Sequence, residues 1–217
     1  MIILCDKLVP VGKQKFGKKT YSLYKITFIR ILAFLLYGII PFFILFFNKN
    51  VELVDFGLNF KNKLTNVWWV FILCLILVSL NYFNRKKSDN LKLYPQIRNK
   101  EWSIKLLIIS ALGWILYLCA YEFMFRGFLL YGSLYAFGKY IAILINIGIY
   151  SLTHIPKGKK EAFGAIPFGL VLCLLTLQSG NILAAFLIHI TIALSNEWLT
   201  LSIHPQIHLA HKKIEKI

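Results

Sequence analysis

Apolar residues in this chain gather in six long segments, which are separated by short polar or basic stretches. A helix needs about 20 apolar residues to cross a bilayer, and about 17 are sufficient. The third segment continues into a more polar stretch, and a turn-forming cluster at residues 178–181 divides the fifth segment from the sixth. The pattern therefore predicts an all-α fold, a polytopic membrane helix bundle of about six transmembrane helices. The predicted helices cover Ile31–Phe47, Val67–Phe83, Leu106–Ala120, Tyr140–Ile155, Ala162–Leu177 and Ile182–Ile203.

The composition agrees with a membrane protein and excludes most soluble classes. Of the 217 residues, 58% are apolar and 16% are charged, whereas a soluble domain is about 45–50% apolar with about 25% charged residues. A disordered chain is excluded as well, because so much apolar surface must be buried. The formal charge of +16, taken alone, would suggest nucleic acid. In so apolar a chain we expect instead membrane lipid as a partner, no nucleic acid, and basic loops on the cytoplasmic side.

The positions of the basic residues orient the predicted helices. The N-terminal tail, the second and fourth connections and the C-terminal tail are all rich in Lys and Arg. In a bundle of six transmembrane helices these four stretches fall on one side of the membrane. The first connection, residues 48–66, mixes basic with acidic residues, and the fifth is uncharged. The positive-inside rule thus predicts that both termini are cytoplasmic.

Most acidic residues lie in tails or connections, but Glu122 lies where an apolar helix is expected. A carboxylate in hydrocarbon is costly, so such a residue is a candidate for function by default. Arg126 follows one helical turn later, which places both side chains on the same face of the helix. Two interpretations stay open: the pair takes part in chemistry, or it is a neutral ion pair that holds the helix to its neighbours.

Two histidines and an asparagine favour chemistry. His154 closes the fourth predicted helix, His189 lies within the sixth, and Asn196 follows His189 by two helical turns. A single histidine in a membrane helix is usually an interhelical hydrogen bonder. Together with Glu122 and Arg126, however, the set can bind a metal, stabilise an oxyanion or activate water. The histidines of the C-terminal tail, which we interpret as interfacial rather than metal-binding, are His204, His208 and His211.

Three motifs on separate predicted helices resemble those of a known family. The sequence YEFMFRGFLL, which begins at Tyr121, resembles the first motif of the CPBP family of intramembrane proteases, the CAAX-protease and bacteriocin-processing or immunity group. The usual form of that motif is EExxxR followed by Gly and an apolar residue. The pair Tyr150-xxx-His154 resembles the second motif, and the surroundings of His189 resemble the third, HxxxN or a variant. The resemblance covers roughly residues 106–203, with the motifs in order.

Two positions depart from the family's pattern. The first Glu of the family's pair, usually assigned to activating the attacking water, aligns with Tyr121, so that Glu122 is the second. The Asn expected four residues after the third-motif histidine is Ala193, and Asn196 offers the same helical face one turn later. Glu161, just past the loop after the second motif, is either a replacement carboxylate or an acid favoured by the dipole at a helix N-terminus; we favour the second interpretation.

The resemblance implies an integral membrane endopeptidase of the bacterial plasma membrane, which hydrolyses a peptide bond at or within the membrane. Its substrate would be a peptide or a membrane protein. In the implied mechanism Glu122 orients or activates water with help from Arg126, and Asn196 contributes a hydrogen bond. His154 and His189 would bind a divalent metal such as zinc or stabilise the oxyanion. The alternative is a non-catalytic membrane binding protein, such as a bacteriocin-immunity or chaperone-like factor.

Three parts of the chain are expected. Residues 1–105 form an N-terminal tail and two transmembrane helices with a basic loop, residues 106–203 form the CPBP-like core with the three motifs, and residues 204–217 form a basic, His-containing tail. Glu122 lies about 24 Å along its helix from the first apolar residue of that segment, whereas His154 is near a cytoplasmic helix end. Either the third helix starts outside the hydrocarbon, or the site opens into a deep cytoplasmic cavity.

Overall fold

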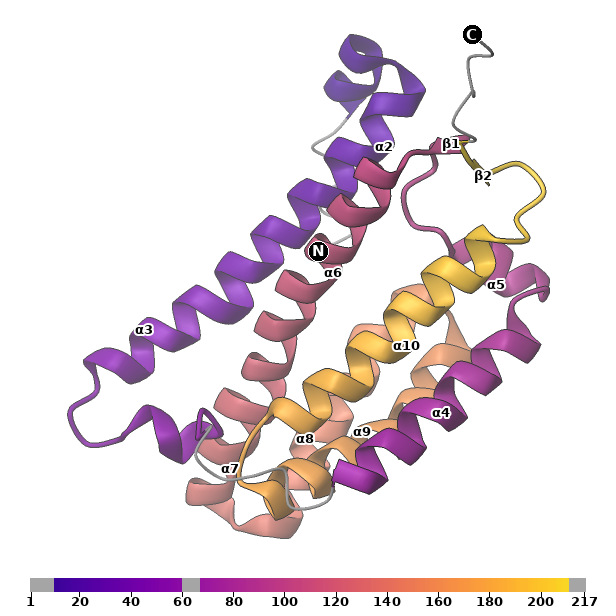
Figure 1. Ribbon diagram of the computed structural model, residues 1–217. Coiled ribbons are helices and arrows are strands. Elements are labelled where there is room, and N and C mark those ends of the chain that lie inside the picture. The colour runs from indigo at the N-terminus through magenta and orange to yellow at the C-terminus, as the bar shows by residue number, and fades with distance from the viewer. Residues whose placement is uncertain (1–9, 60–66, 211–217) are drawn as a thin grey trace, which may run out of the picture.

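The computed structural model describes residues 10–59 and 67–210, and most of them are helical (Figure 1). Two of the short helices, η1 and η3, are π-helical turns inside longer helices, and η2 and η4 are 3₁₀ turns. The elements are α2 (Pro10–Phe34), η1 (Leu35–Ile39), α3 (Ile40–Phe47), η2 (Leu53–Phe56), α4 (Val67–Asn84), α5 (Ser88–Leu93), β1 (Glu101–Trp102), α6 (Ile104–Glu122), η3 (Phe123–Leu129), α7 (Leu130–Phe137), α8 (Lys139–His154), η4 (Ile155–Lys157), α9 (Lys159–Ser179), α10 (Leu183–Leu201) and β2 (His208–Leu209).

The helical membrane bundle predicted from the sequence is confirmed, and each of the six apolar segments is helical. Four helices in the described part of the chain are long and apolar enough to cross a membrane: Tyr21–Phe47, Ile104–Phe137, Lys159–Ser179 and Leu183–Leu201. The apolar part of α4, Trp68–Asn84, is shorter, and α8 has 16 residues. The count of six is therefore approximate. The helix that contains the first predicted segment, Ile31–Phe47, extends toward the N-terminus beyond Ile31.

The connections that are rich in Lys and Arg meet at one end of the bundle, which we call the basic end. It comprises α5, η4 and the parallel pair of β1 with β2. Lys160 at the start of α9 contacts the carboxylate of Asp89 in α5 at 3.2 Å. In Figure 1, α5 and the two strands lie together, whereas α7 and the link between α9 and α10 lie at the other end. This grouping is what alternating crossings by six helices require.

The C-terminal helix α10 lies at the centre of the bundle and packs against α4, α6 and α9. Small and branched side chains from these helices form its contacts, among them Leu172 and Ile188, which are almost fully buried. Large apolar side chains point outward instead; Trp68 is 77% exposed and Tyr140 is 82% exposed. Such exposure is expected of helices that face lipid, because their backbone polar groups are already paired within the helix.

Candidate active site

Glu122 and Arg126 lie together in the interior, at the junction of α6 with the π-helical turn η3. Both side chains are fully buried, and Arg126 Nη1 is 3.3 Å from Glu122 Oε2. Single π-turns inside α-helices are frequent at functional sites. The chain passes close to a neighbour here, because a Cβ on Gly127 would lie 2.9 Å from the carbonyl oxygen of Phe56. A glycine at this position of the motif therefore lets η3 pack against η2.

His189 of α10 completes a buried group with this ion pair. Its Nδ1 is 2.5 Å from Glu122 Oε1, and the imidazole is 9% exposed. Because a carboxylate oxygen only accepts hydrogen bonds, Nδ1 carries the hydrogen. Nε2 is then the nitrogen left for other partners. We call Glu122, Arg126 and His189 the site cluster.

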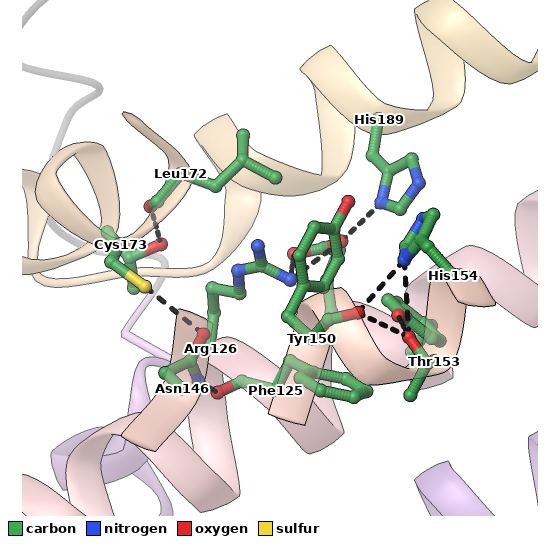
Figure 2. A network of polar contacts seen from close by, with 12 residues as sticks. Phe125, Arg126, Asn146, Tyr150, Thr153, His154, Leu172, Cys173 and His189 are labelled. Atoms are coloured by element: carbon green, nitrogen blue, oxygen red, sulfur yellow. Dashed lines mark hydrogen bonds and ion pairs between the residues drawn. The ribbon is translucent and has the colours of Figure 1, made fainter. Parts of the chain in front are cut away.

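His154 of α8 is held in the same tautomer by a backbone group. Its Nδ1 is 2.9 Å from the carbonyl oxygen of Tyr150, and a carbonyl also only accepts, so Nδ1 donates and Nε2 is left free. The Tyr150 ring lies between His154 and the site cluster, and the Arg126 guanidinium is 4.3 Å from the centroid of this ring. Figure 2 shows His154 and His189 on neighbouring helices, with their rings turned toward the same space.

Tyr121, which stands where the resemblance places the first carboxylate, is buried and committed to other contacts. Its hydroxyl is 2.8 Å from Thr153 Oγ1. Since Thr153 donates its hydrogen to the carbonyl of Tyr150, the Tyr121 hydroxyl is the donor in this pair. The Tyr121 ring also stacks on Phe125, with 4.5 Å between centroids. Tyr121 thus braces α8 against α6 through its hydroxyl and its ring.

Asn146 ties the π-turn to the helices behind it. Its amide nitrogen donates to the carbonyl of Phe125 at 2.5 Å, and its amide oxygen accepts from the thiol of Cys173 at 3.1 Å (Figure 2). All three groups are buried. The position of Arg126, one residue after Phe125, is therefore supported by hydrogen bonds from α8 and α9.

A pocket of about 290 Å³ extends from the basic end to the two imidazoles. His154, His189 and Asn196 lie on its wall, whereas Glu122 does not. The other lining residues are apolar or aromatic side chains deeper in the pocket and three charged residues near its mouth. They are Leu77, Tyr94, Trp114, Tyr150, Lys157, Lys160, Glu161, Gly164, Ala165, Phe168, Ile192 and Ala193.

The pocket links the basic end to the level of Glu122. Glu122 lies in the middle of the continuous helix Ile104–Phe137, and the pocket reaches down to His189, which contacts it. Near the mouth, burial lowers the pKa of Lys157, and Glu161 is exposed in the first turn of α9. A pocket that opens at the basic end and reaches His189 is the feature that the second alternative, a deep cavity, requires.

Two imidazoles could offer nitrogen ligands to a metal. Nε2 is the free nitrogen of both His154 and His189, as zinc binding requires. A catalytic zinc site usually has three protein ligands, however, and within residues 10–59 and 67–210 no group of three His, Cys, Asp or Glu side chains is placed to hold a metal ion. These residues alone fit zinc incompletely.

A second buried charged cluster lies behind the pocket wall and does not follow from the sequence motifs. Glu197 of α10 is fully buried and accepts hydrogen bonds from the Ser110 hydroxyl at 2.9 Å and from the Gln96 backbone N–H at 3.1 Å. Arg30 of α2 donates to the Ser110 carbonyl at 2.9 Å and to the Gln96 side chain at 3.2 Å. It also lies 4.4 Å from the ring centroid of Trp114. We call Arg30, Gln96, Ser110 and Glu197 the wall cluster.

The cost of burying a charge in an apolar helix, which singles out Glu122 in the sequence, applies equally to Glu197 and Arg30. Glu197 lies inside the predicted span Ile182–Ile203, where a carboxylate is as costly as at Glu122. The sequence places Arg30 in the N-terminal tail, before the first predicted span, but in the structure it is 6% exposed and lies within the candidate span Tyr21–Phe47. The C-terminal histidines His204 and His208 lie outside the pocket lining, and His211 lies outside the described residues.

Apolar helices that bury charged and imidazole side chains beside a pocket define an integral membrane protein with an intramembrane polar site. Residues 102–195 match the family model described as "Type II CAAX prenyl endopeptidase Rce1-like". The chain thus carries an Rce1-like domain, consistent with the CPBP family predicted from the motifs. The match covers somewhat under half of the chain, includes the site cluster and His154, and ends one residue before Asn196. No curated protein and no solved structure matches the chain.

Proposed function

We propose that this protein is an intramembrane endopeptidase, which hydrolyses a peptide bond of a membrane peptide or membrane protein in the pocket at the basic end. The observation that carries the proposal is the contact between Glu122 and His189, because it couples a buried carboxylate to an imidazole on the pocket wall. The Rce1-like segment that contains both residues supports the same reaction class.

The tautomers of the two imidazoles suggest how water is held. Nε2 of His154 and Nε2 of His189 are both acceptors, so one water molecule between them donates a hydrogen to each and turns a lone pair toward the substrate carbonyl. The pair of Glu122 and His189 activates this water, and Arg126 holds the carboxylate in place through its contact with Oε2. Asn196, also on the wall, has an amide N–H that suits the oxyanion formed by the attack.

We place the protein in the bacterial plasma membrane with both termini and the pocket mouth in the cytoplasm. The positive-inside rule supports this orientation, because the basic connections gather at the pocket's end of the bundle. Reporter fusions after Phe83, Pro156 and Ile217 should all report the cytoplasm, and a fusion at Asp55 should not. The same side for Asp55 and Pro156 would contradict six crossings.

Cleavage by the purified full chain tests the proposal. A quenched fluorescent membrane peptide library in proteoliposomes, read with and without a chelator, should give cleavage by the wild type and none by His189→Ala. Loss of cleavage with the chelator, restored by zinc, would add a metal to the mechanism. Specific binding of a membrane peptide without cleavage would favour the non-catalytic alternative, in which the polar groups only hold the helices together.

A further inference from the structure

We infer that His189 takes the proton from the attacking water, and that Glu122 is a positioning residue that acts through His189. This assignment rests on the proposed function and names the base within it. It differs from the role that the motif resemblance implies for Glu122, in which the carboxylate itself orients or activates water.

The burial of the two groups carries the first step. Glu122 is fully buried and is not among the residues that line the pocket, whereas His189 is on the wall. The imidazole therefore lies between the carboxylate and the space that a substrate can enter. A general base must come within about 2.6–3.2 Å of the proton it removes, directly or through one water. Of the two groups, His189 lines the space where such a water can lie, whereas Glu122 does not.

The hydrogen bonds carry the second step. Glu122 Oε1 accepts from His189 Nδ1 at 2.5 Å, and its other oxygen is 3.3 Å from Arg126 Nη1. Both oxygens thus face protein groups. The carboxylate fixes the tautomer and the orientation of the ring, and it stabilises the imidazolium that forms when Nε2 accepts a proton.

Two other residues could take over the role of the missing first glutamate as the base, and the structure argues against both. Tyr121 occupies the first motif position, but its hydroxyl donates to Thr153 and its ring is packed on Phe125. Glu161 lines the mouth, but its side chain is exposed in the first turn of α9. Neither residue forms a described hydrogen bond with an imidazole of the site.

The proposed step is balanced within the protein and its substrate. The water oxygen bonds to the substrate carbonyl carbon, and the water proton moves to His189 Nε2, while Nδ1–H stays hydrogen-bonded to Glu122. The resulting imidazolium then gives its proton to the amide nitrogen, the C–N bond breaks, and an amine and a carboxylic acid leave. No oxidant, reductant or co-reactant besides water is needed.

The assignment is tested by comparing the loss of kcat/KM in two variants that each introduce Gln, His189→Gln and Glu122→Gln. We expect His189→Gln to lower kcat/KM by about 10³–10⁴-fold, because an amide cannot take the proton. Glu122→Gln should remain at least about tenfold more active than His189→Gln, since in a comparable triad the orienting carboxylate costs less than the base. Glu161→Gln should lose less activity than His189→Gln, and the control His208→Gln, an exposed residue outside the pocket lining, should stay within about threefold of wild type.

Several results would overturn the assignment. Activity of Glu122→Gln at or below that of His189→Gln would make Glu122 the base, and a dominant loss in Glu161→Gln would move the base to the mouth. If Glu122→Gln fails to fold because Arg126 is left unpaired, the double variant Glu122→Gln/Arg126→Met takes its place in the comparison. Wild-type protein that cleaves no peptide would overturn the proposed function itself, and this assignment with it.

A spectroscopic readout separates positioning from a merely structural role. In protein labelled with ¹⁵N-histidine, the resonance that disappears in His189→Gln should show a protonated Nδ1 and an unprotonated Nε2. In Glu122→Gln the amide N–H₂ can donate to Nδ1 instead, so the same resonance should change tautomer while the protein stays folded. An unprotonated Nδ1 in the wild type would contradict the inference.

Discussion

The bundle buries two charged clusters of similar chemistry, and only one of them reaches the pocket with a free group. In the site cluster, His189 donates one hydrogen bond from Nδ1 to Glu122 and presents its second nitrogen to the pocket. In the wall cluster, the Glu197 carboxylate accepts from a hydroxyl and a backbone N–H, neither of which can change protonation near neutral pH. A buried charge alone is therefore a poor sign of catalysis; a buried charge that acts on an accessible titratable group is a better one.

The site cluster should lose activity without losing the fold. We expect His189→Ala to lower kcat by about 10²–10⁴-fold, the usual contribution of a general base. Its cost in stability should be small, since hydrogen bonds between membrane helices average well under about 1 kcal/mol. Turnover and thermal unfolding in the same detergent check both halves. A large drop in stability with only proportional loss of activity would make His189 a structural residue.

The wall cluster should show the opposite pattern. Arg30 and Glu197 are linked through Ser110 and Gln96. Glu197→Leu therefore leaves the buried Ser110 hydroxyl and the Gln96 N–H without their acceptor and the Arg30 charge uncompensated, and each unsatisfied buried group costs about 1–3 kcal/mol. The double variant Arg30→Met/Glu197→Leu should recover part of that stability, because no uncompensated charge remains. Unfolding free energies measured in detergent test the pair. A Glu197→Leu variant of unchanged stability and no turnover would move Glu197 into the catalytic machinery.

The helices were predictable because each apolar segment is long enough to cross a bilayer, but their limits were not. Arg30 interrupts the first apolar segment, so the sequence places the start of that span after it. In the structure the guanidinium is buried against Trp114 and hydrogen-bonded to α6, and the helix continues without a break on the N-terminal side of Arg30. A charged residue ends a span on a hydropathy scale, whereas its partners on other helices decide whether it is buried.

The sequence predicts which residues form the site and which helix face each one lies on, but it does not predict the contacts between them. Helical spacing places Glu122 with Arg126 and His189 with Asn196. The contact of Glu122 with His189 joins residues 67 positions apart, and it depends on how α6 packs against α10. The tautomers depend on the Tyr150 carbonyl and on Glu122, and the exclusion of Glu122 from the pocket depends on the position of the His189 ring. Such facts follow from packing, which one sequence does not specify.

The wall of the pocket should respond to added bulk more weakly than the site cluster responds to loss of a group. Gly164 lines the pocket, and a Cβ there would meet nothing within 4 Å. We expect Gly164→Leu to lower kcat/KM about tenfold by narrowing the pocket, and to leave stability unchanged or up to about 1 kcal/mol higher, because Leu favours helix over Gly.

A matched control for this change lies in α8. A Cβ on Gly148 also meets nothing within 4 Å, but Gly148 does not line the pocket. Gly148→Leu should therefore keep full activity with a similar gain in helix propensity. Equal activity of the Gly164 and Gly148 variants would show that substrate does not pass Gly164.

The smallest effect is expected from the histidines outside both clusters. Burial lowers the pKa of His204 below its ordinary value of 6.5, and the nearby Arg98 adds repulsion. The unfolded chain then binds a proton on His204 more readily than the folded chain does. The stability that neutral His204 supports is therefore complete above about pH 6.5 and declines as the pH falls below that value.

Replacement of His204, His208 and His211 together by Gln should flatten this slight decline and leave peptide cleavage nearly unchanged. Unfolding midpoints between pH 5 and pH 8, read beside cleavage rates, check the prediction. A folded triple variant without activity would place the catalytic groups in the C-terminal tail and remove the distinction drawn between the two buried clusters.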